Sequence, residues 1–445
     1  MTSLLPVSEP SIQPQNQSQN QPQNQIEPQQ ARPQGYDYDL VIVGGGLVGA
    51  TLACALKGSG LRIALVEAQM QSAAAARGQA YSISLLSSRI FQGLGLWQQI
   101  LPQITTYRHI RLSDADHPGV VHFRPEDLGT DALGYVAEHR VLLTALQEGL
   151  QQCPTVSWLC PAEVINTCYQ ADGVELTLKL ENEQCCLRTR LLVAADGARS
   201  QIRTGAGIGT HGWKYWQSCI VTTVKPEKPH PETAYERFWP SGPFAILPLP
   251  DSRCQIVWTA PHAEAKAMAA LDDQQFLAEL SRRYGSQMGQ LTLAGGRVLF
   301  PVQLMHSNRY TQPRLALIGD AAHCCHPVGG QGVNMGIRDA AALAQVLQAA
   351  HQQGEDIGDW RVLKRYERWR KLENLAILGF TDLLDRCFSN QWLPLVGLRR
   401  VALWLLRTVR PLKVYALQLM TGLRGRPPEL AANAGRVQQW PVAQR

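Results

Sequence analysis

The chain of 445 residues lacks the features that carry a protein into or across a membrane. Its start has neither the cationic segment nor the long apolar core of a secretory signal, and Arg32 is the only arginine before the first predicted strand, too few for a transit peptide. Its most apolar late stretch, residues 392–406, is broken by arginines and cannot supply the run of about twenty apolar residues that spans a bilayer. These absences favour a cytoplasmic location.

The cysteines do not have the spacing of a metal or redox site. No pair shows Cys-x-x-Cys, and eleven cysteines are an odd number in a long chain, which favours reduced thiols. Residues 323–326 (His-Cys-Cys-His) are metal-ligating types, but they lie inside a loop that a different motif explains below. We therefore predict packing roles for them and no metal site.

Also absent is a basic stripe interleaved with stacking aromatics, and the net charge is only +6, so we expect no nucleic-acid partner. The positive charge gathers late in the chain, on Arg399, Arg400, Arg407, Arg410, Lys413, Arg424 and Arg426. These alternate with Trp392, Leu393, Leu395, Val396, Leu398, Val401, Leu403, Trp404, Leu405 and Leu406. Such a segment can make a peripheral membrane contact or pack on a partner helix. Alternatively it packs on the fold, which we expect for at least half of its apolar side chains.

Residues 1–36 are mostly Gln, Pro, Asn and Ser, with Pro-Gln-Asn-Gln repeated. This composition buries too little apolar surface to offset the entropy of folding, so we predict a disordered tail. The chain as a whole, with 45% hydrophobic and 18% charged residues, is typical of a globular protein.

A dinucleotide-binding motif opens the globular part. Asp39–Val43 predicts a buried strand, and residues 44–49 (Gly-Gly-Gly-Leu-Val-Gly) have the G-x-G-x-x-G spacing. In this motif Gly44 permits the tight turn, Gly46 lets a pyrophosphate approach the backbone, and Gly49 lets the next helix pack on the strand.

A carboxylate follows this motif at the expected distance. The predicted strand Arg62–Glu67 ends on Glu67, about twenty residues past the glycines, where an acid accepts ribose hydroxyls. Because a carboxylate repels a 2′-phosphate, the site suits FAD or NAD and not NADP.

A second candidate site lies in Leu315–Asn334, where an apolar strand ends on Gly319-Asp320 and a glycine-rich loop feeds a helix start. Asp320 can bind the hydroxyls of a ribityl chain. The N–H groups at the helix start, at Gly332, Val333 and Asn334, would face the negative charge of a reduced flavin. NAD needs no second site of this kind, so the segment favours FAD; the alternative is an ordinary strand–turn–helix with glycine caps.

A third segment, Leu192–Arg203, places Asp196-Gly after a strand. The glycine-rich, Asp-Gly and Gly-Asp segments together resemble the motifs of the class A flavoprotein monooxygenases, the para-hydroxybenzoate hydroxylase superfamily. Within it the chain is similar to the ubiquinone-biosynthesis FAD-dependent hydroxylases, from about Tyr38 to about Leu430. The resemblance also rests on Leu94–Trp97, Leu133–Arg140, Pro243–Leu249 and Met420–Leu430.

The resemblance implies roles for several residues. Asp196 would lie near FAD and an incoming NAD(P)H, and Arg140 would contact FAD. Alternatively, Asp196 and Arg199 only form an ion pair across a turn, and Arg140 is a surface arginine. Gln79 stands where the family often has arginine, and can donate hydrogen bonds but brings no charge. NAD(P)H would be a transient reductant, because no separate fold for it is visible.

The implied activity is hydroxylation of an aromatic ring of a polyprenyl phenol or quinol by O₂, in ubiquinone or plastoquinone biosynthesis. Two alternatives keep the fold: a FAD-dependent reductase of isoprenoid double bonds, and a FAD-bearing scaffold of a quinone-synthesis complex. No catalytic base can be named, and His323 and His326 are expected to be packing histidines. Phe238, Trp239 and Phe244 are candidates for the substrate-pocket wall or, equally, for sheet core.

The predicted fold class is α/β: a Rossmann-like FAD-binding domain with an inserted antiparallel β-sheet substrate domain and a C-terminal helical segment. The predicted parts are a tail (1–36), FAD-binding residues 37–210 and 301–375, a substrate-domain sheet (211–300) and C-terminal helices (376–445). The expected helices include Ser87–Gln99 and His139–Gln152 within a helical stretch 71–160. The expected sheet strands are Ser218–Val224, Thr233–Trp239, Phe244–Leu249 and Cys254–Thr259.

Overall fold

A computed structural model of the protein describes residues 35–75, 78–114, 117–151, 153–181, 183–286 and 288–432. The described residues from Tyr36 onward belong to one compact unit. The predicted disordered tail lies outside the described residues except for its last two positions.

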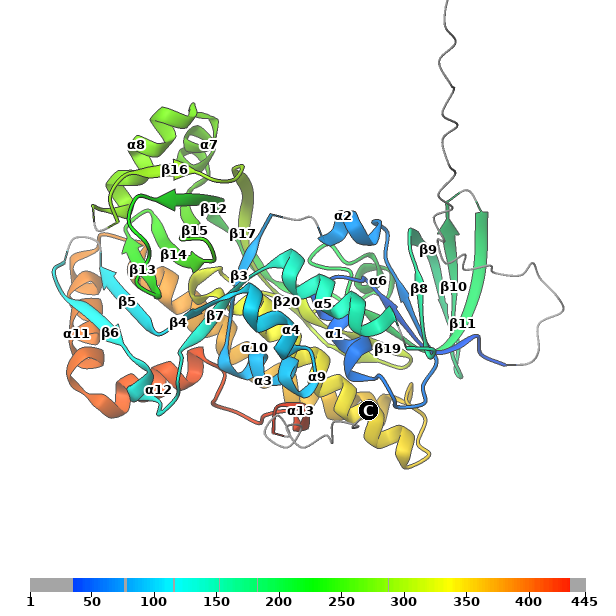
Figure 1. Ribbon diagram of the computed structural model, residues 1–445. Helices are drawn as coiled ribbons and strands as arrows, with labels where there is room; N and C mark the ends of the chain where they lie inside the picture. The colour runs from blue at the N-terminus through cyan, green and yellow to red at the C-terminus, as the bar shows by residue number, and fades with distance from the viewer. Residues whose placement is uncertain are drawn as a thin grey trace, which may run out of the picture. The chain divides into compact units, whose positions relative to one another are not determined.

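The first sheet contains the strand that precedes the dinucleotide motif, and several of its strands lie on the right in Figure 1. Its strand order is β18 (Thr311–Gln312), β19 (Leu315–Leu317), β11 (Glu183–Ala194), β1 (Tyr38–Val43), β2 (Ile63–Val66) and β8 (Val156–Leu159), with β10 (Val174–Leu180) and β9 (Ala162–Tyr169) continuing antiparallel from β11. From β19 to β8 the strands pair in parallel. Every side chain of Leu40–Val43 and Ile63–Val66 is buried, which shows that both faces of this sheet are covered.

Helices from distant parts of the chain pack against this sheet and each other. α1 (Leu47–Ala55) contacts α5 (His139–Gln151) and α9 (Gln331–Gln352). The remaining helices of this half are α2 (Gln71–Ala75), α3 (Leu85–Gly93), α4 (Trp97–Ile100), α6 (Gln201–Gly205) and α13 (Glu429–Ala432).

The single helix predicted over Ser87–Gln99 is wrong. The structure has α3 and α4 instead, because Gly95 adopts a left-handed φ of 77° between them. Ser84 begins α3 by accepting a hydrogen bond from the Ser87 N–H. A small sheet of β3 (Ala80–Ile83), β7 (Gly134–Glu138) and β4 (Thr105–Tyr107) adjoins these helices.

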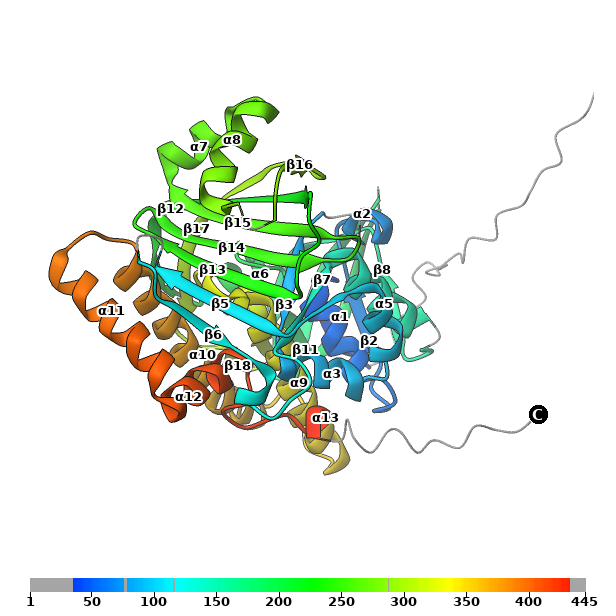
Figure 2. The ribbon, with the colours of Figure 1, turned by 60° about the vertical axis from the view of Figure 1, so that its left-hand side comes forward.

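The second sheet is mainly antiparallel, and its central strands lie side by side in Figure 2. Its order is β20 (His323–Cys324), β17 (Val298–Ser307), β12 (Thr210–Pro226), β15 (Arg253–Pro261), β14 (Gly242–Leu249), β13 (Thr233–Trp239), β5 (His109–Asp114) and β6 (Val120–Phe123), with β16 (Leu291–Leu293) beside β12. The four strands predicted within residues 218–259 are confirmed at its centre. On one face, α7 (His262–Ala270) and α8 (Asp273–Tyr284) bury Phe276 and Tyr284 against Trp258.

Residues 109–123 were expected within a helical stretch, and that expectation is wrong. β5 pairs in parallel with β13, more than a hundred residues later in the chain, and β6 continues the sheet. β5 gains its main hydrogen-bond partner from a remote strand, and β6 pairs with β5, so local pattern alone underestimates the strand character of this region.

The C-terminal helices are α10 (Trp360–Phe388), α11 (Leu393–Thr408) and α12 (Arg410–Met420). Arg399 was grouped with a basic surface edge, but it is buried and paired. Its Nε and Nη2 donate to the two oxygens of buried Asp114 at 2.9 and 3.0 Å, and its Nη1 donates to the carbonyls of Phe388 and Asn390. This bidentate contact fastens α11 to β5 and to the end of α10. Among the described helices, none has the length and apolar character needed to cross a bilayer.

The predicted class is therefore confirmed: an α/β protein with a Rossmann-like parallel sheet, a largely antiparallel second sheet and a C-terminal helical segment.

Candidate flavin and substrate site

Three neighbouring parallel strands bring the three predicted segments together. Val43 at the end of β1 lies beside Ala194 of β11, which lies beside Leu317 of β19. The loops that leave these strands carry the glycine motif, Asp196 and Asp320. Ligands of parallel α/β sheets bind outside the carboxyl ends of the strands, and all three segments meet there.

A cavity of about 1040 Å³ begins at these loops. It is lined by Gly46, by residues 327–334, by one face of the second sheet, and by residues of α10, α11 and α12. Asp320, Gly332, Val333 and Asn334 also line it, so five of the predicted cofactor residues share one space.

The other two motif glycines are in close backbone contact. A Cβ on Gly44, whose φ is 107°, would lie 2.3 Å from the Ala195 carbonyl oxygen, and one on Gly49 would lie 1.9 Å from the Gly44 oxygen. The turn and the start of α1 therefore fit against β11 only without side chains at these positions. Gly46 differs, because a Cβ there would meet nothing within 4 Å.

Glu67 holds the glycine loop from the end of β2. Its two carboxylate oxygens accept hydrogen bonds from the Gly45 N–H at 2.8 Å and the Gln69 N–H at 2.9 Å. It is beside the loop as predicted, but it does not line the cavity.

Asp196 has one oxygen in use and one without a partner. Oδ2 accepts from the Ile202 N–H at 3.3 Å, whereas Oδ1 is buried with no hydrogen bond. Among the described ion pairs none joins Asp196 to Arg199, so the simple turn ion pair is not what the structure has. Arg203 donates to the Ala321 carbonyl at 2.9 Å and thereby ties this segment to the Asp320 turn.

Asp320 faces the cavity from the 3-10 turn Gly319–Ala321. Its side chain is accessible from the cavity, but burial within the molecule raises the pKa of its carboxyl above the usual range. The turn is held from behind by Asp339, which accepts from the Gly319 N–H at 3.2 Å and contacts His323 Nε2 at 2.5 Å. His323 and Arg370 beside Asp339 lower the pKa of that carboxyl to about 2.

The loop before α9 uses Asn334 as a brace. Gly330 has left-handed dihedrals, φ 61° and ψ 36°, at the start of the helix. The Asn334 Nδ2 donates to the carbonyls of Ser82 and Gly330, and its Oδ1 accepts from the Ser84 N–H at 2.9 Å. The side chain of Asn334 thus joins the loop to β3, and its predicted flavin contact is left to the backbone.

His323 and His326 pack inside the fold, as expected, and neither lines the cavity. The Val328 N–H donates to His326 Nδ1, which leaves the proton on Nε2, facing Gln217 Oε1 at 3.2 Å and Asp385 Oδ1 at 3.5 Å. Burial lowers the pKa of His326 to about 4, so it is neutral near pH 7. In the described part of the chain no three His, Cys, Asp or Glu residues form a metal-binding group.

Arg140 is not brought into the cavity. Its side chain is 62% exposed at the start of α5 and pairs with Glu138 at 3.2 Å. Gln79 does line the cavity and accepts a hydrogen bond from the Tyr81 hydroxyl.

The three aromatic residues that were candidates for the substrate-pocket wall lie on two different faces of the second sheet. Phe238 lines the cavity and stacks on Phe388, with ring centroids 3.9 Å apart. Phe244 and Trp239 pack on the opposite face of the sheet, in the core around Trp258. Adjacent positions on a strand point to opposite faces, which the alternation of apolar and polar residues did not reveal here because both faces are buried.

Comparison with known proteins agrees with this geometry. The FAD binding domain family matches residues 37–380. The chain is 39% identical to ubiquinone hydroxylase UbiL of Rhodospirillum rubrum, over 88% of this chain and 92% of that one. It is 36% identical to 3-demethoxyubiquinol 3-hydroxylase of Escherichia coli, over 86% and 98%. The chain belongs to the ubiquinone-biosynthesis FAD-dependent hydroxylases.

This hydroxylase therefore falls within the class A flavoprotein monooxygenases. A solved structure of that fold, p-nitrophenol 4-monooxygenase PnpA of Pseudomonas putida, superimposes with a TM-score of 0.73 at 18% identity, covering 87% of this chain and 98% of PnpA. That likeness concerns the fold alone.

The residues present fit FAD. Open space over Gly46 suits a pyrophosphate, the unpaired Asp196 Oδ1 is an acceptor for a ligand hydroxyl or N–H, and Asp320 lines the cavity. The N-terminus of α9 adds free backbone N–H groups at Gly332 and Val333. These are the residues that would hold the cofactor.

Two features of the site were missed in the sequence. The cavity wall includes Glu236 of β13, a charged type that local pattern places on a solvent face. It also includes residues of α11 and α12, among them Leu403, Leu412 and Tyr415. The sequence shows that residues 392–406 are largely apolar. Their contact with the cavity depends on how α11 packs, and the pairing of Arg399 with Asp114 sets that packing.

Proposed function

We propose that the protein hydroxylates an aromatic ring of a polyprenylated phenol or quinol in isoprenoid quinone biosynthesis, using FAD, NAD(P)H and O₂. One observation carries the proposal: the flavin segments open into a cavity of about 1040 Å³ whose far walls are apolar side chains of the second sheet and of α10–α12. A ring could lie near the flavin loop while an apolar tail occupies the rest. Bound FAD would supply the redox chemistry that activates O₂.

The chain's own contribution is placement and exclusion of water. Phe238 and Phe388 form a stacked wall, and Val328 of the flavin loop lines the same cavity. A dry pocket keeps water from intercepting the activated oxygen before it reaches the ring.

The test is turnover by purified, flavin-loaded protein with a phenol that carries a short prenyl tail. We expect NAD(P)H oxidation and O₂ uptake that depend on the phenol, and a product one oxygen atom heavier when ¹⁸O₂ is supplied as label. A product with a reduced prenyl double bond, formed without O₂, would instead identify the isoprenoid reductase. Absence of any turnover in protein that complements a deletion strain would identify the quinone-complex scaffold.

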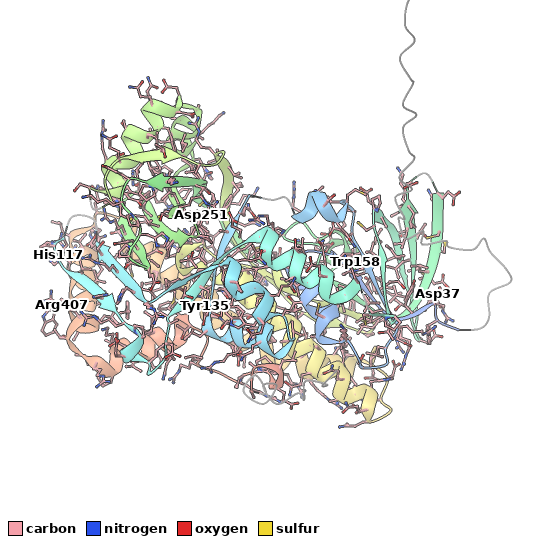
Figure 3. All side chains as sticks on the ribbon, viewed as in Figure 1. Asp37, His117, Tyr135, Trp158, Asp251 and Arg407 are labelled. Carbon is pink, nitrogen blue, oxygen red and sulfur yellow. The ribbon has the colours of Figure 1, made fainter. Side chains whose placement is uncertain are left out.

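A peripheral membrane contact is the second part of the proposal, and it rests on the outer face of α11 and α12. Trp392, Leu393, Leu398, Val401, Trp404, Val409, Leu412 and Tyr415 are exposed there. Leu412 and Tyr415 also line the cavity, so the cavity reaches the surface at this face. Arg407 is exposed on α11 (Figure 3), and Arg410 is exposed at the start of α12. Apolar side chains edged with arginine suit an anionic bilayer, where such substrates reside.

We expect flotation of the protein with vesicles of phosphatidylcholine and phosphatidylglycerol, and weaker flotation with phosphatidylcholine alone, since each basic residue near an anionic surface contributes about 1 kcal/mol. Trp392→Glu with Trp404→Glu should weaken binding to the anionic vesicles at least about tenfold, because two large apolar anchors are replaced by acids. Trp360→Glu is the matched control, since Trp360 is 47% exposed at the start of α10. A wild-type protein that ignores anionic vesicles would rule out this contact.

A further inference from the structure

Two carboxyl groups line the cavity, and the proposed function so far uses one. Among the described residues that line it, Glu236 and Asp320 are the only acids, and there is no lysine or arginine. Glu236 lies in the middle of β13, between Ala234 and Phe238, which line the same cavity. Its partner across the sheet in β14 is Ala245. A lone carboxyl on an apolar wall is costly to bury, which points to a role in the cavity.

The position of Glu236 is where the sheet meets the flavin loop. The backbone of Gly329, the residue after Val328 in that loop, gives the carboxyl a hydrogen bond. Small side chains at 234 and 245 leave room beside it for a flat ring. A ring held there would be flanked by the loop that is predicted to contact the flavin.

We propose that Glu236 takes the proton of the ring hydroxyl of the phenolic substrate, an inference that rests on the proposed ring hydroxylation. The substrate O–H bond breaks, the proton moves to a carboxylate oxygen of Glu236, and the electron pair stays on the ring oxygen. The resulting phenolate is more electron-rich and accepts an oxygen atom more readily. The proton returns to the solvent or to the product after hydroxylation.

The environment of Glu236 matches it to this task. Burial raises the pKa of its carboxyl from 4.5 to about 8, and the hydrogen bond from Gly329 opposes that rise. A phenol has a pKa of about 10, so transfer to this carboxylate is unfavourable by only about 100-fold, against more than about 100,000-fold for an ordinary glutamate. General bases work best when their pKa lies near the working pH.

Other titratable groups near Glu236 set the controls. On β12 of the same sheet, which β14 and β15 separate from β13, burial raises the pKa of the Cys219 thiol to about 12, with a smaller contribution from Glu236. The acids, thiols and imidazole that share the cavity are Asp320, Cys324, Cys325 and His139. The phenols that share it are Tyr81, Tyr107, Tyr235 and Tyr415. Asp320 is a second carboxyl group and His139 an imidazole, so the pH profile must be shown to belong to Glu236.

The first measurement is the pH dependence of turnover. Because the deprotonated carboxylate is the working form, wild-type kcat should fall about tenfold per pH unit below pH 8. Glu236→Gln should lower kcat at pH 8 about 100-fold, change KM little, and remove the slope between pH 6 and 8. Glu236→Asp, which keeps a carboxyl, should keep the slope at a reduced rate. Glu163→Gln, at an exposed site on β9, should behave as wild type.

The second measurement is a rescue experiment. A fluorinated prenylphenol whose hydroxyl is already ionised at pH 8 needs no base, so it should restore the turnover of Glu236→Gln to within about tenfold of wild type. A pH slope that persists in Glu236→Gln, or a variant that this phenol does not rescue, would assign the proton to another group and overturn the inference. Absence of ¹⁸O-labelled product from wild type with either phenol contradicts the proposed function, whereas labelled product from wild type without rescue of the variant contradicts only the role of Glu236.

Discussion

Gly46→Val protein is expected to be purified colourless and without activity, yet with the wild-type fold. Gly46 has extended dihedrals, φ −70° and ψ −174°, which valine adopts without strain. No protein atom lies within 4 Å of the position of a Cβ there. The added side chain therefore fills only the space that a pyrophosphate would use, and the cost falls on FAD binding alone.

The loss of FAD affinity should be at least about a thousandfold, or roughly 4 kcal/mol. Titration of apoprotein with FAD, followed by flavin fluorescence, measures it, and thermal unfolding of the two apoproteins should coincide. Addition of FAD should raise the unfolding temperature of wild type and not of the variant. Gly205→Val, at an exposed position of α6 where a Cβ also meets nothing within 4 Å, is the matched control and should load FAD normally. A yellow, active Gly46→Val protein would place the pyrophosphate elsewhere.

The parts of the site that sequence predicts are those whose chemistry is local. The glycine motif, Asp196 and Asp320 each follow a short apolar run, and parallel strands place all such ends at one edge. The strands of the second sheet at Thr233–Trp239 and Cys254–Thr259 are short runs rich in aromatic and β-branched residues, which is a local signal of a strand. These elements need no knowledge of remote partners.

The features that the sequence did not predict depend on contacts between segments that are far apart in the chain. Arg399 looks like one more surface arginine until Asp114, 285 residues away, accepts its two hydrogen bonds. Glu236 would ordinarily face water from a strand, and only the packing of β13 over the flavin loop turns it into a cavity wall. Asn334 was predicted to face the flavin through its backbone N–H, and the sequence did not indicate that its side chain donates to a carbonyl of β3, 252 residues earlier.

Asp339 shows the same dependence, and its substitution is expected to have the largest effect on stability. Its side chain is completely buried. Oδ1 accepts from Arg370 Nε at 2.8 Å and from Asn374 Nδ2 at 3.0 Å, while Oδ2 contacts His323 and the Gly319 N–H. The carboxylate thus joins α9, α10 and the Asp320 turn. It is a candidate for holding Asp320 in place without itself facing the cavity.

Asp339→Asn should lower the free energy of unfolding by about 3–5 kcal/mol, because an amide leaves buried Arg370 without its main counter-charge. The matched control is Glu373→Gln, which removes the partly exposed second partner of Arg370 and should cost less than about 1 kcal/mol.

The effect of Asp339→Asn on stability should also depend on pH. The pKa of Asp339 is lowered from 3.8 to about 2 in the folded protein, so its charge stabilises the fold above pH 3.8, and this is lost as pH falls towards 2. Urea unfolding of wild type and of Asp339→Asn should therefore show a difference in unfolding free energy that narrows by roughly 2 kcal/mol between pH 4 and pH 2. If the difference in unfolding free energy stays constant over this range, the charge of the Asp339 carboxylate is not what holds α9, α10 and the flavin turn together.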